Sequence, residues 1–211
     1  MAVQRVATRA NWAARNPILL PGEIGFESDT GNQKIGNGIE GWNKLHYYGS
    51  PGHWGEFSST LEQSATANTP TEVTFNRTDP NGDGVRIELN SRITVNNPGV
   101  YVFEFNLQLS NDDTQIHDAH FWLRRNNSGS AGDVERTTTA ASIIEKHGGV
   151  RGNNNLLIDH TLTLAREDYI ELMWAPSNAL VTLQANAAIT SPYTRPSQPS
   201  VVLNVYQVAA A

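Results

Sequence analysis

The sequence predicts an all-β protein with a small ribbon-like module at its N-terminus and a β-sandwich after it. Three observations support this fold class. Apolar residues alternate with polar ones in several segments, which is the pattern of a half-buried strand. Clusters of Gly, Pro, Asn and Asp separate these segments, and no long segment repeats its apolar residues at the helical period. Short strands joined by turns, without helices to cover a sheet, favour two sheets packed face to face.

Composition limits the classes of function. The 211 residues suffice for one large or two small domains, and 15 basic against 21 acidic side chains give a formal charge of −6. This balance argues against a nucleic-acid partner, whose phosphates are neutralised by Lys and Arg. The chain has no cysteine, so a disulfide framework and a thiol nucleophile are excluded. Residues 1–9 lack the apolar core of a signal peptide and no apolar run reaches bilayer length, so we expect assembly in a host cytoplasm without membrane insertion.

The stretch of residues 16–45 is dense in turn residues and contains several large apolar side chains. Residues 10–15 suit a single helical turn that Asn16-Pro17 ends, and the Gly, Pro, Asn and Asp residues after it predict brief strands joined by tight turns. A segment of about fifty residues buries too little surface to close a core alone. Its apolar side chains therefore need a partner surface, which threefold self-association would supply. We predict that Trp12 and Trp42 lie at this trimer interface.

A series of short motifs runs through this region: Trp12-Ala13-Ala14, Asn16-Pro17, Gly22-Glu23-Ile24-Gly25, Glu27-Ser28-Asp29-Thr30-Gly31, Lys34-Ile35-Gly36, Gly38 and Trp42-Asn43-Lys44-Leu45. In these motifs and their order, the first quarter of the chain resembles the N-terminal domain of the phage major tropism determinant family and related tail-fibre proteins. Ser28 stands where Thr is usual in that family and Asn37 where Asp is common, and neither change breaks a turn. The resemblance implies that residues 1–49 form a β-prism-like trimerisation module, intertwined between three chains of a virion protein.

The glycines at Gly36, Gly38 and Gly41 also match the G-x-G-x-x-G fingerprint of dinucleotide-binding proteins. That fingerprint requires a helix whose N-terminus meets the pyrophosphate. Gly49 and Pro51 follow too soon to leave room for such a helix. We interpret the motif as a turn and predict no cofactor.

Residues 50–55 are interpreted as a linker to a head of residues 56–211, because Gly49-Ser50-Pro51-Gly52 is the most linker-like stretch of the chain. Alternation in the head is clearest over residues 100–109, where Tyr101, Phe103, Phe105, Leu107 and Leu109 share one face. The other predicted strands are residues 72–76, 85–89, 93–95, 119–124, 156–164, 169–174, 180–188 and 201–208.

The order of two segments in the head carries a second resemblance. Ile93-Thr94-Val95 precedes Asn97-Pro98-Gly99-Val100-Tyr101-Val102-Phe103, and Leu162-Thr163-Leu164 precedes Glu167-Asp168-Tyr169-Ile170-Glu171-Leu172. This order is similar to that of complement-globular-head and tumour necrosis factor-like jelly rolls, over residues 54–211 and more loosely than the first resemblance. Gly is common in that family where Glu167 stands. The resemblance implies a jelly-roll β-sandwich and, because such jelly rolls are tight homotrimers, the same threefold symmetry.

The last predicted strand is apolar on both faces. Val201, Leu203 and Val205 share one face, and Val202, Tyr206 and Val208 share the other. Apolar residues on both faces indicate burial on both faces. We predict that the first face fills the sandwich and that Val202 and Tyr206 face the trimer axis; burial under a loop is the alternative.

Two sequences resemble metal sites. Residues 79–84, from Asp79 to Gly84, match the first half of a calcium loop, but Asn90 stands where its bidentate Glu is expected. His117 and His120 are closely spaced, but an i, i+3 pair on a strand points to opposite faces. We interpret the first as a polar hairpin loop, leaving open whether it ever binds a cation, and we name no metal ligand.

The remaining signals indicate binding rather than catalysis. The sequence contains no G-x-S-x-G elbow, no H-E-x-x-H motif and no convincing carboxylate pair, so we predict no enzymatic activity and name no catalytic residue. Residues 125–133, 146–155 and 191–200 form long polar loops, and recognition residues commonly lie on loops of a rigid scaffold. We name Arg151, Tyr193 and Arg195 as candidate contacts for a host carbohydrate or protein; the alternative is that these loops are solvated connections.

These observations favour a homotrimeric bacteriophage virion protein, a short tail fibre or receptor-binding protein that contacts the host surface. The alternative is a capsid decoration protein, such as a cement or head-spike protein, which the shortness of the chain favours. A depolymerase fits less well, because a long repetitive β-helix with paired acids is missing. The expected partners are two further copies of the chain, other tail or capsid proteins and the host surface, and the expected location is the virion.

Overall fold

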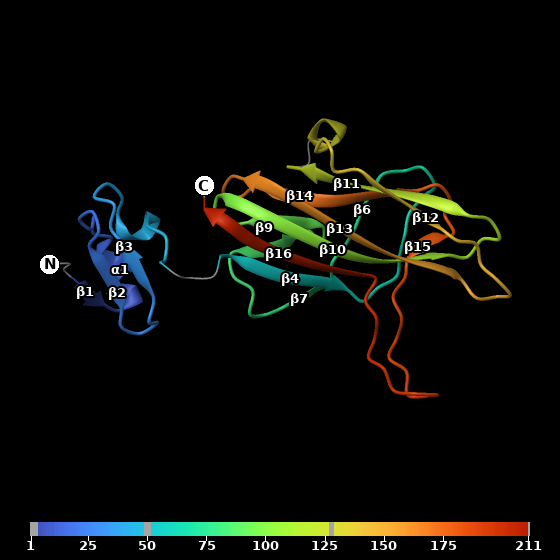
Figure 1. The fold of residues 1–211 in the computed structure, drawn as a ribbon, viewed down its shortest axis with the longest axis horizontal. Coiled ribbons are helices and arrows are strands. Elements are labelled where there is room, and N and C mark those ends of the chain that lie inside the picture. The colour runs from blue at the N-terminus through green and yellow to red at the C-terminus, as the bar shows by residue number, and fades with distance from the viewer. Residues whose placement is uncertain (1–3, 49–51, 127–128, 211) are drawn as a thin grey trace. The chain divides into compact units, whose positions relative to one another are not determined.

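The computed structural model describes residues 4–48, 52–126 and 129–210 (Figure 1). Contacts within the chain divide it into two compact units, residues 1–51 and residues 52–211, which we call the N-terminal unit and the head.

The described residues of the N-terminal unit form a mixed sheet, a short α-helix and a 3-10 helix. Its elements are β1 (Gln4–Ala7), α1 (Arg9–Arg15), β2 (Ile24–Glu27), β3 (Gln33–Ile35) and the 3-10 helix η1 (Trp42–Lys44). β2 pairs in parallel with β1 and antiparallel with β3. The helix begins after Thr8, whose Oγ1 accepts a hydrogen bond from Asn11 N at 3.3 Å, and it ends at Asn16, whose φ of 42° is left-handed. The helical turn predicted at residues 10–15 is confirmed.

Two tryptophan rings form the centre of the N-terminal unit. Trp12 and Trp42 are 3% and 2% exposed, and their rings stack with centroids 4.2 Å apart. Trp12 Nε1 donates to Phe26 O at 2.9 Å, and Leu19 and Leu45 complete the buried cluster. Both rings are therefore packed inside a single chain, because the turns between them return η1 to the helix. A place for Trp12 and Trp42 at a trimer interface stays a prediction, and within one chain both rings are already buried.

A polar network is buried beside these rings. Glu27 is fully buried and accepts hydrogen bonds from Tyr47 Oη at 2.6 Å and from Thr30 Oγ1 at 2.5 Å. Lys34 Nζ donates to Trp42 O at 2.9 Å and lies 4.3 Å from the centroid of the Tyr47 ring. Burial lowers the pKa of Lys34, and burial together with the hydrogen bond to Glu27 raises the pKa of Tyr47 to about 12.

The head is a sandwich of two sheets, so the predicted all-β fold is confirmed. The strands of the first sheet, in spatial order, are β5 (Gln63–Ser64), β15 (Val181–Leu183), β10 (Gly99–Asn111), β16 (Val201–Ala210), β4 (Trp54–Ser59) and β7 (Arg77–Thr78), with β13 (Gly152–Leu164) also paired to β10. Those of the second are β12 (Thr139–Ile143), β11 (His117–Arg125), β14 (Tyr169–Pro176), β9 (Arg92–Val95) and β8 (Val85–Glu88), with β6 (Thr71–Glu72) paired to β14. A 3-10 helix, η2 (Gly129–Gly132), lies in the connection from β11 to β12.

Alternating residues of the two sheets fill the core between them. On β10, Tyr101, Phe103, Phe105, Leu107 and Leu109 are all at most 1% exposed. They belong to the same buried cluster as alternate residues of β14 in the second sheet, namely Ile170, Leu172 and Trp174. The period-two pattern of residues 100–109 and 169–174 therefore predicted the core side of both strands correctly.

One side of β10 is shared by two strands placed end to end. β16 pairs with residues 99–107 of β10, and β15 pairs with residues 109–111. Residues 184–200, between β15 and β16, leave the sheet as an extended loop that we call the arm, the orange-red loop at the lower right of Figure 1. Its two legs are bridged at Asn186–Gln198 and Ile189–Arg195. The strand predicted for residues 180–188 ends at Leu183, because β16 already occupies the next positions beside β10.

The turn before β14 explains why Glu can stand at position 167, where the resembling jelly-roll family commonly has Gly. This residue has a φ of 66°, a left-handed conformation that glycine adopts without strain. Its carboxylate lies 2.6 Å from Arg86 Nη2, and the next residue, Asp168, accepts a hydrogen bond from Ala165 N at 2.7 Å. An ion pair and a side-chain cap therefore hold a turn for which the resembling family commonly uses Gly. Within the described part of the chain, no helix is both long and apolar enough to cross a membrane.

Candidate functional site

The loops at one end of the head form a surface that we call the distal tip. The chain enters the head at the opposite end, where Trp54 of β4 pairs with Tyr206 of β16 and β10 begins. β10 ends at Asn111, and the loops near this end are residues 60–62, 112–116, 144–151 and 177–180. These four loops make up the distal tip.

Arg151, one of the predicted binding residues, lies in a network of ion pairs within the distal tip. Its Nη1 is 2.8 Å from Glu62 Oε1, and its Nε is 3.7 Å from Asp112 Oδ2. Lys146 Nζ is 3.1 Å from Asp112 Oδ1, and Thr182 Oγ1 donates to Glu62 Oε1 at 2.9 Å. The Arg151 side chain is still 36% exposed. The network connects three loops, so Arg151 both fixes their arrangement and presents part of its guanidinium to solvent.

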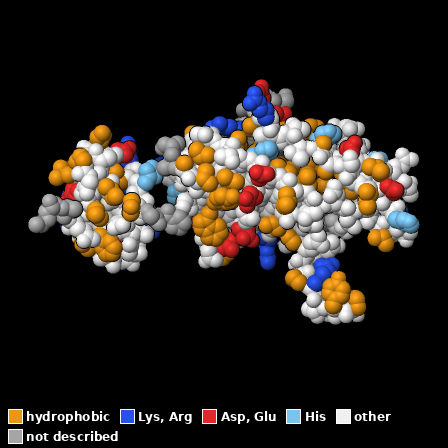
Figure 2. Space-filling view, viewed as in Figure 1, with side chains coloured by type: hydrophobic (Ala, Val, Ile, Leu, Met, Phe, Trp, Pro, Cys, Tyr) orange, Lys and Arg blue, Asp and Glu red, His pale blue; other side chains and the backbone are white. Residues whose placement is uncertain are grey.

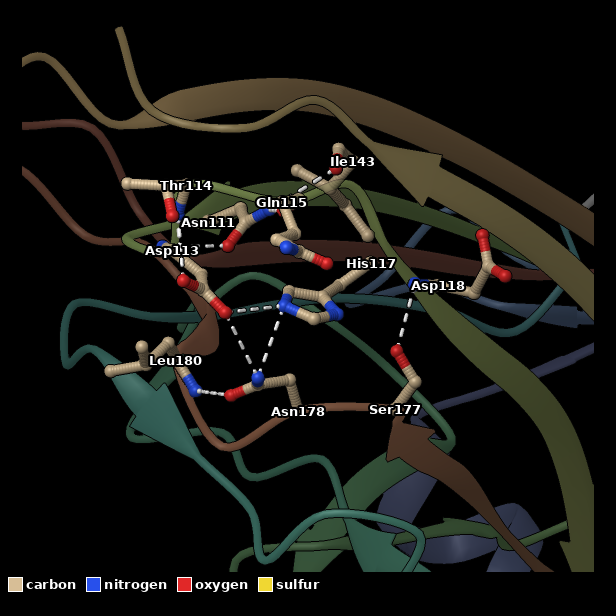
Figure 3. Close-up of polar contacts among 10 residues, drawn as sticks. All are labelled: Asn111, Asp113, Thr114, Gln115, His117, Asp118, Ile143, Ser177, Asn178 and Leu180. Carbon is tan, nitrogen blue, oxygen red and sulfur yellow. Dashed lines mark hydrogen bonds and ion pairs between the residues drawn. The ribbon is translucent and has the colours of Figure 1, made fainter. Parts of the chain in front are cut away.

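A second cluster joins two of these loops (Figure 3). Asp113 Oδ2 lies 2.7 Å from His117 Nε2 and 3.2 Å from Asn178 Nδ2, so side chains from two loops and from the first residue of β11 converge. Beside them Asn111 is fully buried; its Nδ2 donates to Gln115 O at 2.7 Å and its Oδ1 accepts from Asp113 N at 2.9 Å. The hydrogen bond from His117 lowers the pKa of Asp113, because it favours the ionised carboxylate. These bonds hold the loop after β10 against the loop after β14.

The four loops of the distal tip also carry exposed apolar side chains. Five of them, each between 46% and 68% exposed, are Leu61, Ile116, Ile144, Val150 and Leu180. Exposed apolar side chains that gather on one surface mark a site of interaction. Because ion pairs already hold these loops in place, their apolar side chains can be buried against a partner at a lower cost in conformational entropy.

Tyr193 and Arg195 lie on the arm and not in the distal tip. Tyr193 is 62% exposed, and Figure 2 shows the arm as a protrusion with hydrophobic and basic side chains. Arg195 is half-buried, and its Nη1 donates to Pro196 O at 3.1 Å. Arg195 lines a hollow of about 490 Å³ between the arm and the head, together with the carboxamides of Gln108, Asn153, Asn155, Gln184, Asn186 and Gln198. Arg195, and not Arg151, therefore lines this hollow with the three consecutive asparagines of residues 153–155.

Val202 and Tyr206 point away from the sandwich core on β16, on the face opposite to three buried residues of the same strand. Val202 is half-buried and Tyr206 is 37% exposed, so this face is partly open in a single chain. Tyr206 Oη donates to Glu104 Oε1 at 2.7 Å, and this hydrogen bond raises the pKa of Tyr206. A place for Val202 and Tyr206 at a trimer axis stays a prediction.

The motifs that resembled metal sites form ordinary polar contacts. Asp79 Oδ1 accepts hydrogen bonds from Asn81 N at 2.7 Å and from Asn81 Nδ2 at 2.9 Å, which closes a local turn. Asp83 Oδ2 instead lies 3.1 Å from His53 Nδ1. His117 contacts Asp113, whereas His120 on the same strand is exposed. Among the residues that the structure describes, no group of three or more His, Cys, Asp or Glu side chains is arranged to hold a metal ion.

Sequence reasoning missed most of the distal tip. Asp113 and Asn178 are 65 positions apart, and neither stands in a motif. The signal that could have indicated the site is the isolated apolar residue in an otherwise polar loop, as at Ile116 and Val150, because such a residue has no core to join.

Comparison with known proteins assigns the two units to different relatives. Residues 7–40 match the family model of the major tropism determinant N-terminal domain. A hyaluronoglucosaminidase of Streptococcus pyogenes phage H4489A is 52% identical over 40 residues, which are 19% of this chain and 11% of that protein. The chain thus spans about a tenth of the length of this relative.

The fold of a tumour necrosis factor, Eiger from S. frugiperda, superposes on this chain with a TM-score of 0.52. The match covers 77% of this chain and 96% of that one, at 15% sequence identity. It shows a jelly-roll fold of the tumour necrosis factor type. The resemblances to a phage tropism-determinant domain and to this jelly roll are both confirmed.

Proposed function

We propose that the chain is a homotrimeric bacteriophage tail-fibre or receptor-binding protein whose distal tip contacts the host surface. The observation that carries this proposal is the combination of a tropism-determinant-like segment at residues 7–40 with a jelly-roll head whose far end exposes five apolar side chains. The relative with the name of an enzyme is similar to this chain over 40 residues. We propose that the two proteins share a virion module and that this chain has no such activity.

Trimerisation is supported by apolar surface on both units. In the N-terminal unit, Val6, Ile18, Leu20, Ile39 and Tyr48 are each at least 60% exposed, although Trp12 and Trp42 are buried. These exposed side chains, rather than the tryptophans, would supply the contact between chains. On the head, the outward face of β16 with Val202 and Tyr206 has the same partly exposed apolar character. Light scattering is expected to give about three times the chain mass of 23.1 kDa.

The receptor surface that we propose contains Arg151 together with the exposed apolar residues of the distal tip. Those apolar side chains favour a protein receptor or the apolar part of a glycoconjugate over a freely hydrated sugar, because their burial would drive association. Tyr193 and Arg195 are not included, because they lie on the arm at the side of the head.

Adsorption competition tests the proposal. Purified protein is expected to saturate host cells and to prevent the phage from adsorbing. Val150→Asp is expected to raise at least about tenfold the concentration of purified protein that halves phage adsorption, which corresponds to about 1.4 kcal/mol of binding free energy. Leu89→Asp is the matched control, because Leu89 is 74% exposed but lies in the turn between β8 and β9. A folded trimer that does not compete would overturn receptor binding and favour the alternative, decoration of the capsid.

A further inference from the structure

The arm is attached to its own chain near its base, where Gln198 Nε2 donates to Gln108 Oε1 at 2.7 Å and Asn186 Nδ2 donates to Gln198 Oε1 at 3.1 Å. Its two legs are joined at two isolated bridges, and Tyr193 near its end is 62% exposed. The arm begins and ends within the first sheet, between β15 and β16, and a hollow separates it from the outward face of that sheet. An extended, partly apolar loop of this kind is stabilised when it packs on a second surface.

The outward face of the first sheet offers such a surface. The hollow beside the arm is lined by Gln108 of β10 and Asn155 of β13, which are directly paired across the two strands. A second hollow of about 390 Å³ lies further along the same two strands and is lined by Glu104 and Asp159, among others. Because side chains two residues apart on a strand share a face, the two hollows follow one another along the same face of the sheet. Leu157, between them, is 71% exposed.

This face has an excess of negative charge that the chain itself does not neutralise. The register pairs Glu104 with Asp159 on one side and with Asn204 on the other, and Asn204 with Glu56, so three exposed carboxylates lie in one row across four strands. Like charges on directly paired residues destabilise a sheet. None of the ion pairs among the described residues includes any of these three carboxylates. One cation, Arg77 of the edge strand β7, is on the same face, where it is paired with Ser58.

The arm carries the opposite charge. Arg195 has no carboxylate partner among the described residues, and the residues that line the hollow with it are carboxamides and one leucine. Its guanidinium keeps donors that Pro196 O does not use, in a planar fork that matches a carboxylate. Among the described residues, a single chain therefore presents a cation on its arm and a row of anions on its sheet face that form no ion pairs, although Glu104 accepts a hydrogen bond from Tyr206 Oη at 2.7 Å.

We propose that the arm of one copy docks on the sheet face of the next, where Arg195 pairs with Glu104 and Asp159 of the partner subunit. Arm and face are different surfaces of the same chain, so the contact is head-to-tail, and repetition around a threefold axis closes it into a ring. Pairing with Arg195 relieves the repulsion between the two carboxylates, and the arm covers Leu157 of the partner subunit. The inference rests on the proposed homotrimer and names the contact that completes it.

Cross-linking tests the contact directly, because the chain has no native cysteine. Arg195 and Asp159 are both replaced by Cys in one chain, and the protein is treated with a short bis-maleimide. This reagent is chosen because an arginine–carboxylate pair separates the two backbones by more than a direct disulfide allows. We expect covalent dimers and trimers on a denaturing gel. The control is Arg136→Cys with Asp159→Cys, because Arg136 is exposed in the connection between β11 and β12 of the other sheet.

Charge exchange provides an independent measurement. Arg195→Glu is expected to raise at least tenfold the concentration at which trimers dissociate in light scattering. Added salt is expected to lower that concentration in the variant, because it screens the repulsion between the introduced carboxylate and the two acidic side chains. Adding Glu104→Lys and Asp159→Lys to this variant is expected to restore assembly, whereas these two changes alone are expected to weaken it.

The outcomes separate this inference from the proposed function. If light scattering shows trimers but the cross-linking yield is no higher than in the control, or the cross-links form only within one chain, the arm contact is overturned and the homotrimer stands. A wild-type protein that is monomeric at micromolar concentration would overturn both.

Discussion

Replacing Trp12 with Ala tests whether the N-terminal unit has a core of its own. Trp12 is 3% exposed, stacks on Trp42 at 4.2 Å and donates a hydrogen bond of 2.9 Å to Phe26 O. Removing a buried Trp costs about 3–5 kcal/mol, and loss of the ring stack and the hydrogen bond places this change in the upper part of that range. Domains are stabilised by roughly 0.05–0.15 kcal/mol per residue, so a unit of about fifty residues has roughly 3–8 kcal/mol in total. We expect the N-terminal unit to unfold and the head to stay folded.

The assay is amide hydrogen exchange of the full chain, read by mass spectrometry. Peptides from residues 4–48 are expected to lose protection in Trp12→Ala, and those from residues 52–126 and 129–210 to keep it. The circular dichroism band of two stacked indoles is expected to disappear as well. Ile18→Ala is the control in the same unit, because Ile18 is 60% exposed and its truncation is expected to change stability by no more than about 0.5 kcal/mol.

One result would refute this reasoning. If Trp12→Ala dissociates the trimer while residues 4–48 keep their protection, then Trp12 contacts a partner chain and does not belong to a core within one chain. The interface that the sequence predicts for Trp12 would then be correct.

Two further changes test the turns and the buried polar groups. Leu89→Asn is expected to stabilise the head by roughly 0.5–1 kcal/mol in thermal or urea unfolding, because Leu89 has a φ of 49°, which Asn tolerates better than Leu. Leu61→Asn is the control, because it also removes an exposed leucine. A similar gain in stability in this control would show that the turn is not the cause. Burial raises the pKa of both Tyr47 and Tyr101 to about 12, so each favours the folded state at neutral pH and this contribution is lost as the pH rises from 10 to 12. In an absorbance titration, Tyr47→Phe is expected to reduce the phase near pH 12, and loss of amplitude near pH 10 instead would contradict the burial of this hydroxyl.

Local patterns determined the strands and the turns of this protein. Alternation over residues 100–109 was sufficient to predict which side of β10 is buried, because neighbouring side chains of a strand point to opposite faces whatever the strand pairs with. The motifs of residues 7–40 predicted the phage-type N-terminal segment for a similar reason. Their glycines and asparagines specify backbone conformations that are set within a few residues, as at Gly22 and Gly38, whose φ values are 79° and 76°.

The tertiary structure alone decided which residues meet. Trp12 and Trp42 look alike in the sequence whether they pack on each other or on another chain, because apolar character indicates burial but not the partner. The arm exists because β15 and β16 pair with the same side of β10. Since β16 occupies the positions next to β15, residues 184–188 have no place beside β10 and leave the sheet. Only the strand pairing shows this. Asp113 and Asn178 meet across 65 positions in the chain, and Arg195 rather than Arg151 lines a hollow with the asparagines of residues 153–155. Contacts of this kind depend on the path of the whole chain, which no window of the sequence contains.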